Sequence, residues 1–398
     1  MTTITSTPNT TSMRRRAKVR VAPGTVAHFT QELLGDTLHE RRVDSIALAV
    51  TGVLHAANLA IHAIGRGLAA SRGMDAKHGT KQVDRLLSNT GVELWRLFDS
   101  WVPFVVGVRK EIVVALDWTE FDADDQATIC LYLITRHGRA TPLVWKTVKK
   151  ATLAGKRNDY EYDVVERLGS SLPPDVKITL LADRGFGDQK FYAFLATFGW
   201  DYVIRFRECI LVTDAAGATK PAAKWLEKSG RAKMLKGVGV TDDKAAVPAV
   251  VVVHDKRMKD AWCLATSRVD LGAAGVTKLY GRRFTIEETF RDTKDSHFGM
   301  GLSATHIGTA ARRDRLLFIA ALAYALLVLL GAAGERCGLD RTLKASTTKR
   351  RTLSLFKQGC YWYDAIPAMR DDRFDRLMTA YDASVREHEV LRRVFGLL

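Results

Sequence analysis

The segments EIVVALDW (residues 111–118) and VKITLLADRGFG (residues 176–187) decide the fold of this chain. Each is a short apolar run of strand length that leads to a carboxylate, Asp117 in the first and Asp183 in the second. Buried strands rarely carry a carboxylate, so both aspartates need a reason to be there. One reason is metal binding, and the alternative is that each aspartate begins a turn or caps the following helix.

Further strand and helix patterns surround these two segments. Residues 127–135 and 140–148 read as two more strands with turn residues between them. We expect helices over 158–169 and about 188–199, and a strand over 202–207. The expected elements follow one another in the order strand, strand, strand, helix, strand, helix, strand. This order favours an α/β fold, in which helices cover the faces of a mixed sheet.

The patterns divide the chain into six expected parts. Helical spacing dominates before the first strand, turn-rich sequence with two strands follows residue 207, and strongly helical sequence begins near residue 278. The parts are a disordered basic arm (1–25), a helical DNA-binding domain (26–105), the first part of the core (106–207), a β-rich insertion (208–278), the second part of the core (279–345) and a helical C-terminal tail (346–398).

The charge of the chain favours a polyanionic partner. Its 398 residues include 60 Lys and Arg against 44 Asp and Glu, a net charge of +16. Nucleic acid is the first partner to consider, an anionic membrane surface the second, and a merely basic protein the plain alternative. In the helical region, Lys81 and Arg85 lie four residues apart on one helical face, close to Lys77. This face either binds DNA or is simply solvated.

Cysteine use and the N-terminus favour a cytoplasmic protein. The five cysteines are scattered and form no C-x-x-C pair, so the sequence suggests neither a zinc site nor a disulfide framework. Arginines and lysines between residues 14 and 20 are not followed by the apolar core of a signal peptide. Residues 316–334 contain no charge and have the length of a membrane span, but a central helix of a large core looks the same.

A third carboxylate stands out in KLYGRRFTIEETFRDTK, residues 278–294. If this stretch is one helix, Tyr280, Arg283, Glu287 and Lys294 lie within an arc of about 60°. A carboxylate beside cations suits phosphodiester chemistry, in which the carboxylate binds metal and the cations hold phosphates. The alternative is an exposed helical stripe with an Arg283–Glu287 pair, and Glu288 lies on another face.

Taken together, these motifs resemble a known family. The spacing Tyr280-x2-Arg283-x3-Glu287-x6-Lys294 is similar to the Y-R-E-K signature of bacterial cut-and-paste DDE transposases of the insertion sequence 4 family. Asp183 in LADRGFG resembles the second-aspartate motif of that family, and Asp117 in VVALDW resembles the first. The likeness extends from about residue 75 to 360 and includes the apolar segment and the basic residues 347–351.

The resemblance implies an RNase H-like core with a β-rich insertion ahead of the glutamate-bearing helix, and a buried rather than membrane-spanning apolar helix. Asp117, Asp183 and Glu287 would be catalytic and would hold two Mg²⁺ ions, for which Mn²⁺ can substitute. The DNA-contacting set would be Tyr280, Arg283, Lys294, Arg184 and Trp262. Trp262 would stack on a flipped base in members that cut through a hairpin, or else is a core aromatic.

The implied partners are double-stranded DNA, at the transposon ends and at the target, and a second copy of the chain in the DNA complex. The implied location is the cytoplasm, on the nucleoid. Two other functions fit the same motifs: a structure-selective DNA nuclease of the same fold, and a non-catalytic DNA-binding regulator derived from a transposase. A membrane protein is the remaining alternative.

Overall fold

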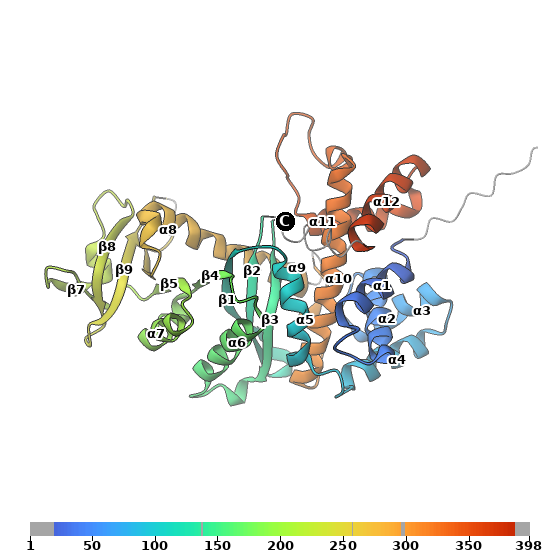
Figure 1. Ribbon diagram of the computed structural model, residues 1–398, viewed down its shortest axis with the longest axis horizontal. Coiled ribbons are helices and arrows are strands. Elements are labelled where there is room, and N and C mark those ends of the chain that lie inside the picture. Colours follow the sequence, from blue (N-terminus) through green and yellow to red (C-terminus); the bar gives the residue numbers. More distant parts are fainter. Residues whose placement is uncertain (1–19, 137, 257, 296–298, 387–398) are drawn as a thin grey trace, which may run out of the picture.

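The structure is a computed structural model, and it describes residues 20–136, 138–256, 258–295 and 299–386 (Figure 1). Most of the expected basic arm therefore lies outside the described residues. The arm also ends earlier than expected, because the first helix begins at Pro23. Proline suits the first turn of a helix, where its missing N–H would have no partner.

Residues before the sheet are helical, as the spacing of apolar residues predicts, and from residue 20 onward they form five helices. Helices α2, α3 and α4 cross at points where the backbones touch. A Cβ added to Gly79 of α4 would lie 2.2 Å from the carbonyl oxygen of Gly65 of α3, so only glycine permits this approach. The helices are α1 (Pro23–Leu34), α2 (Glu40–Ala56), α3 (Ile61–Arg72), α4 (Ala76–Ser88) and α5 (Leu94–Val106).

A mixed sheet forms the centre of the molecule, with strands in the order β3-β2-β1-β4-β5-β10-β9-β8-β6-β7. β1 pairs in parallel with β4, β4 pairs in parallel with β5, and the other neighbours are antiparallel. This arrangement is compatible with an RNase H-like core. The core strands are β1 (Glu111–Phe121), β2 (Gln126–Ile134), β3 (Ala140–Lys149), β4 (Lys177–Ala182), β5 (Asp201–Phe206) and β10 (Trp262–Thr266).

The turn-rich segment after β5 forms strands that extend the same sheet. β10 pairs with β5 on one side and with β9 on the other, so the added strands continue the core sheet beyond β10. They are β6 (Leu211–Thr213), β7 (Thr219–Pro221), β8 (Lys233–Val240) and β9 (Ala245–Val253). In Figure 1 they lie at the end of the molecule opposite the N-terminal helices.

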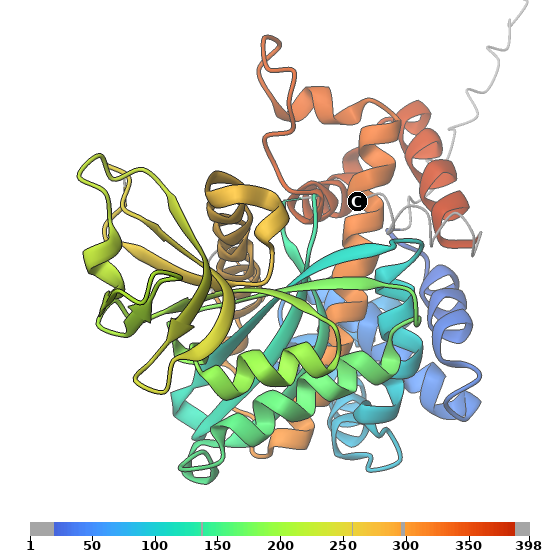
Figure 2. The ribbon, with the colours of Figure 1, turned by 60° about the vertical axis from the view of Figure 1, so that its left-hand side comes forward.

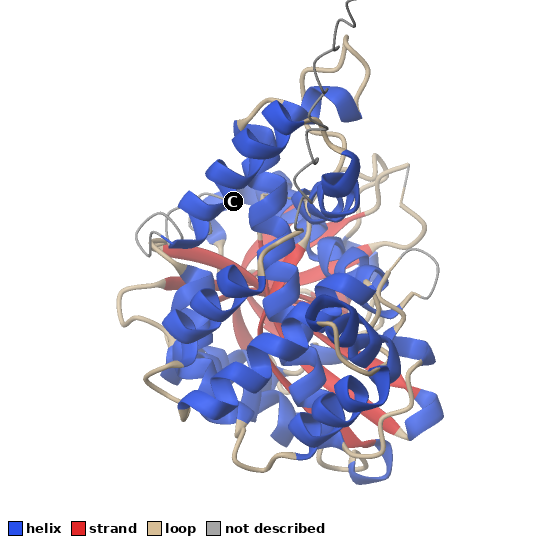
Figure 3. Ribbon diagram, turned by 90° about the vertical axis from the view of Figure 1, so that its right-hand side faces the viewer, coloured by secondary structure: helices blue, strands red, loops and turns tan. Residues whose placement is uncertain are grey.

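Helices cover both faces of the sheet. In Figure 2, α6 (Arg157–Ser171) and α7 (Gln189–Thr197) run in front of the core strands and α10 (Ala310–Arg336) runs behind them. α8 (Gly272–Gly281) packs against β5 and β9, and α9 (Thr285–Lys294) packs against β2 and β3. The chain ends in α11 (Leu355–Ala365) and α12 (Asp371–Arg386), which both pack on α10. Figure 3 shows helices in front of the sheet on this side of the molecule.

The apolar segment is the buried centre of α10. This helix is long and apolar enough to cross a membrane, yet 94% of its most apolar window is buried inside the protein. It packs against β3 on one side and against α2, α4, α11 and α12 on the others. A helix that is apolar all round suits such a position.

Candidate active site

Asp117 and Asp183 lie side by side on neighbouring parallel strands. The pairing of β1 with β4 ends with Leu116 opposite Ala182. Asp117 directly follows Leu116, and Asp183 directly follows Ala182. Asp183 follows the last residue of β4, as predicted. Asp117 does not end its strand, because β1 continues to Phe121 while it remains paired with β2. The prediction of two strand-end aspartates is therefore wrong for Asp117, although the expected juxtaposition holds.

Both aspartates also hold the local backbone. An Oδ1 atom accepts the N–H of the next residue in each case, at 2.9 Å for Asp117 and 2.7 Å for Asp183. Asp183 thereby caps the short 3₁₀ helix Arg184–Phe186. Each aspartate thus does help to shape the local backbone, as the alternative expected. Its second oxygen, Oδ2, is left for contact with Arg283.

The segment that carries the third carboxylate is not one continuous helix. A 3₁₀ turn, Arg282–Phe284, separates α8 from α9, so the prediction of a single uninterrupted face is wrong. Tyr280, Arg283 and Glu287 nevertheless gather at the two aspartates. Lys294 does not join them: its ammonium group donates to Thr119 Oγ1 at 3.1 Å and to the Glu120 carbonyl at 2.8 Å.

The guanidinium of Arg283 joins the three carboxylates. Its Nη1 lies 3.1 Å from Asp117 Oδ2, and its Nη2 lies 3.0 Å from Glu287 Oε1 and 3.9 Å from Asp183 Oδ2. The Arg283 side chain is buried, whereas the Glu287 side chain is half exposed. Three acidic side chains that are far apart in the sequence therefore meet around one buried cation.

Burial and charge work against each other at this point. Burial raises the pKa of Asp117 above its usual value, although the nearby Arg283 charge and the Trp118 N–H both oppose the rise. Burial alone would lower the pKa of Arg283. Tyr280 and the surrounding carboxylates outweigh that effect and raise this pKa instead. Arg283 thus stays charged and neutralises part of the acidic cluster.

Tyr280 and Trp262 build the wall beside Asp183. The Tyr280 hydroxyl donates to Asp183 Oδ1 at 3.4 Å, and burial raises the pKa of Tyr280 above its usual value. Trp262 is the first residue of β10, is half buried, and meets the Tyr280 ring edge-on with ring centroids 4.9 Å apart. Trp262 also packs against the exposed Phe284. Arg184, directly after Asp183, is exposed to solvent.

The acidic cluster has the right chemistry for a hard divalent cation. Its donors are carboxylate oxygens, which Mg²⁺ and similar ions prefer. Among the described residues, no three His, Cys, Asp or Glu side chains are already arranged to hold a metal ion. Asp117, Asp183 and Glu287 instead converge on a guanidinium, which shows that they can surround positive charge.

α9 is docked by a buried polar contact that the sequence did not suggest. Thr289 Oγ1 accepts the N–H of Ala140 at 2.9 Å and lies 3.2 Å from the Ala140 carbonyl, which fastens α9 to the start of β3. One turn later, the buried Asp292 pairs with Arg139 at 2.6 Å and with Lys357 at 3.2 Å. These contacts set the position of Glu287. A threonine and an aspartate in a helix give no such signal until their partners are known.

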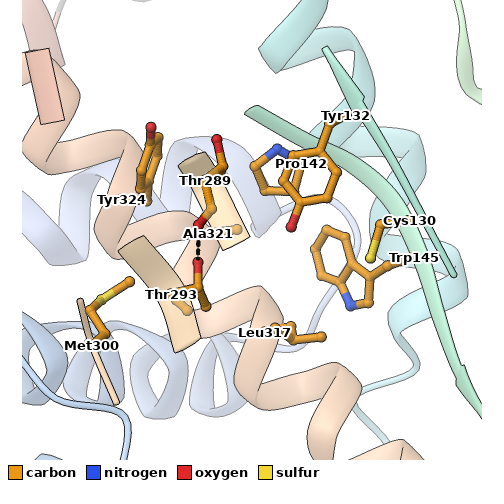
Figure 4. Close-up of a pocket in the computed structure, with 11 residues that line it drawn as sticks. Cys130, Tyr132, Pro142, Trp145, Thr289, Thr293, Met300, Leu317, Ala321 and Tyr324 are labelled. Carbon is orange, nitrogen blue, oxygen red and sulfur yellow. Dashed lines mark hydrogen bonds between the residues drawn. The ribbon is translucent and has the colours of Figure 1, made fainter. Parts of the chain in front are cut away.

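A small cavity lies beneath α9, between this helix, α10, β2 and β3 (Figure 4). Its volume of ≈ 30 Å³ is enough for one water molecule. Thr289, Thr293 and Tyr324 line it together with apolar side chains. The Tyr324 hydroxyl is buried and finds no hydrogen-bond partner among the described residues.

Glu161 is a second residue that sequence reasoning missed. It lies on α6, is 4% exposed, and accepts the Nε1–H of Trp118 at 2.9 Å. Burial raises its pKa to about 7, although Trp118 and Arg157 oppose the rise. The available signal was its spacing, since Glu161 falls on the same helical stripe as Val164, Val165 and Leu168.

A mixed α/β sheet with paired aspartates on adjacent parallel strands and a glutamate from a following helix defines the class of metal-dependent nucleic-acid enzymes. Residues 109–326, more than half of the chain, match the family model of the transposase DDE domain. The chain belongs to this family and is a DDE transposase, a nucleotidyltransferase type of enzyme that acts in DNA transposition and recombination. No curated protein matches it significantly.

Proposed function

We propose that the protein binds the terminal inverted repeats of its transposon, cleaves the DNA strands there and joins them to a target, as members of the insertion sequence 4 group do. Asp117, Asp183 and Glu287 would hold two Mg²⁺ ions, with Mn²⁺ as a substitute. The observation that carries this proposal is the convergence of these three carboxylates on Arg283.

The chemistry is two phosphoryl transfers without a covalent enzyme intermediate. Water attacks a phosphorus at the transposon end, the P–O3′ bond breaks, and the released 3′-OH then attacks another phosphodiester. Asp117, Asp183 and Glu287 would hold the divalent ions, which when bound would supply charge to activate the attacking oxygen and stabilise the leaving one. The protein's part is positioning: Tyr280 orients Asp183, and Arg283 holds the carboxylates together and presents a cation near the phosphate.

The support for DNA binding by the helical region, residues 26–105, comes from α4. Lys77, Lys81 and Arg85 are exposed, and none of them forms an ion pair with another described residue. Asp84, the acidic residue of the same helix, pairs instead with Arg312 at 2.6 Å. The solvent face of α4 therefore carries uncompensated positive charge, which suits backbone phosphates.

The proposal covers the remaining residues as well. Arg184, directly after Asp183, and Lys294, at the end of α9, would contact phosphates, and Trp262 would stack on a base that leaves the helix if the second strand is cut through a hairpin. Two copies of the chain would pair the two ends. The transposase would consist of separate domains: the β-rich insertion (208–278), the core on either side of it and the tail (346–398). It would act on the nucleoid in the cytoplasm.

The test is Asp183→Asn in the full chain. We expect this variant to bind duplex DNA as the wild type does and to lose Mg²⁺-dependent nicking, because one oxygen ligand and one negative charge disappear. Asp175→Asn is the matched control, since Asp175 lies in the loop before the same strand and pairs only with the exposed Lys110 among the described residues. Persistent nicking by Asp183→Asn rejects the assignment.

A second assay separates the transposase from its two alternatives. Duplexes with pre-cut 3′-OH ends are incubated with a supercoiled plasmid, and joined products are scored. A transposase joins the ends to the plasmid, a structure-selective nuclease cuts without joining, and a non-catalytic regulator does neither.

A further inference from the structure

A groove lined by four arginines lies beside the acidic cluster. It has a volume of ≈ 460 Å³ and is bounded by the first residues of β1, the last residues of β2 and the end of α8. The arginines are Arg109, Arg136, Arg268 and Arg282, and Glu111 is the one acidic residue that lines the groove. The wall between them is mainly apolar.

Two of these arginines already bind other groups of the protein. Arg268 pairs with Asp270 at 2.9 Å and with Glu111 at 3.2 Å, so its charge and that of Glu111 are compensated. The Nη1 of Arg109 donates to the carbonyls of Val105 and Val106 at the end of α5. Lysine or arginine often caps a helix end in this way.

The other two arginines lack an anion. Within the described part of the chain, neither Arg136 nor Arg282 has a carboxylate within ion-pair distance. The Arg282 guanidinium donates to the carbonyl of Ile134 at 3.5 Å. Arg136 is exposed, and its charge together with burial lowers the pKa of Arg282. Two like charges that line one groove, one of them partly buried, are stabilised when an anion enters between them.

The groove and the active site share two elements. Arg282 precedes Arg283, the residue that holds the carboxylates, and Val113 on the groove wall lies on the same face of β1 as Asp117. Beyond Arg136, Arg351 donates to the carbonyl of Arg136 at 3.2 Å and pairs with Glu335. The exposed Lys349 and Arg350 extend the positive charge along that loop. Basic side chains thus run from the groove to the loop 344–351.

We propose that this groove binds backbone phosphates of the DNA duplex on which the active site acts, through the guanidinium groups of Arg136 and Arg282. The inference rests on the proposed function, since it extends the DNA path beyond the acidic cluster. Arginine suits the role because its planar fork can donate two hydrogen bonds to one phosphate. The same chemistry would also accept the phosphate of a free nucleotide, so the test distinguishes the two sources.

The experiment measures the binding of a fixed-sequence duplex to the full chain by fluorescence anisotropy over a series of KCl concentrations. Each phosphate contact that is lost reduces the slope of log K against log salt by about 0.9. We therefore expect Arg136→Gln with Arg282→Gln to lower the slope by about 2 and to weaken binding by about tenfold or more. The double Arg→Lys variant keeps the charges and should keep most of the slope.

Controls separate this proposal from misfolding and from failure of the proposed function. Arg370→Gln removes an exposed cation distant in sequence from the groove and should leave the slope unchanged. Thermal melting confirms that each variant is folded. An unchanged slope in the double Gln variant overturns the groove assignment, whereas loss of nicking in Asp183→Asn still supports the transposase. Loss of binding to a mononucleotide, with duplex binding unchanged, also overturns it.

Discussion

The Nη1 atom of Arg283 lies 3.1 Å from Oδ2 of Asp117, which places a buried guanidinium where a catalytic cation is expected. A positive side chain and a divalent ion compete for the same carboxylates. Arg283 therefore has two consequences: it stabilises the acidic cluster without metal, and it opposes metal binding. These effects have opposite signs and can be separated by one substitution.

Arg283→Gln should destabilise the metal-free protein by about 3 kcal/mol, because it removes a buried guanidinium and leaves three neighbouring carboxylates without their cation. Millimolar Mg²⁺ or Mn²⁺ should restore much of this loss, and the rise in melting temperature on adding metal should be larger than for the wild type. Differential scanning calorimetry with and without metal measures both effects. Arg291→Gln, which removes an exposed pair with Glu288 on α9, is the control. Equal metal-induced shifts in all three proteins would contradict the prediction.

Thr289→Val tests whether the docking of α9 positions Glu287. Valine keeps the shape of the side chain but leaves the buried Ala140 N–H without its acceptor, which costs about 2 kcal/mol. We expect a lower free energy of unfolding in urea and a lower rate of nicking at saturating DNA, with little change in DNA affinity. Thr293→Val is the control, since its hydroxyl donates only within α9 to the Thr289 carbonyl (Figure 4). Equal losses in both variants would show that the Ala140 contact has no special part.

The sequence predicted where strands occur better than where helices break and strands end. Asp117 and Asp183 were found because a carboxylate at the end of an apolar run is unexpected in a buried strand. This feature can be recognised from the sequence alone. The break at Arg282–Phe284 was missed because helical spacing continues through a short 3₁₀ turn with little change in the positions of the side chains. The extension of β1 past Asp117 was missed because only its pairing with β2 makes it a strand.

Side-chain partners were the least predictable feature. Lys294 shares the spacing of Tyr280 and Glu287, yet its ammonium group bonds to the end of β1, because α9 ends beside that strand. Thr289 bonds to Ala140 and Asp292 pairs with Arg139, both at the hairpin between β2 and β3, and Asp292 also pairs with Lys357 of α11. Spacing along one segment indicates which residues share a face, but only the tertiary fold decides what that face meets.

Glu161→Gln should change how stability depends on pH. The pKa of Glu161 is raised to about 7 in the folded protein and is near 4.5 in the unfolded chain. The wild type therefore keeps its full stability below the lower value and loses stability as pH rises toward 7. Glutamine does not titrate, so the stability of the variant relative to wild type should grow with pH, by up to about 3 kcal/mol.

Urea denaturation of both proteins at about pH 5 and about pH 8 measures this difference. The comparison must be made between the two proteins, because burial also raises the pKa of Asp314 to about 7 and that group titrates in both. Glu166→Gln, an exposed residue of the same helix, is the control and should follow the wild type. A relative stability that does not change with pH would mean that Glu161 is not held in its neutral form.

Gly359→Ala tests how closely α11 packs on the apolar helix α10. A Cβ at this position would lie 1.9 Å from the carbonyl oxygen of Leu327, so the two helices must move apart. Forcing an extra methyl into a filled contact costs about 1–3 kcal/mol and more where backbone is the obstacle. The melting temperature should fall clearly.

Gly24→Ala in α1, where no atom lies within 4 Å of the added Cβ, is the control and should be neutral or slightly stabilising. Because α10 also packs on β3, which is joined through β2 to the strand β1 that bears Asp117, a Gly359→Ala variant that folds should also nick DNA more slowly. Unchanged melting would show that the two helices can separate without cost.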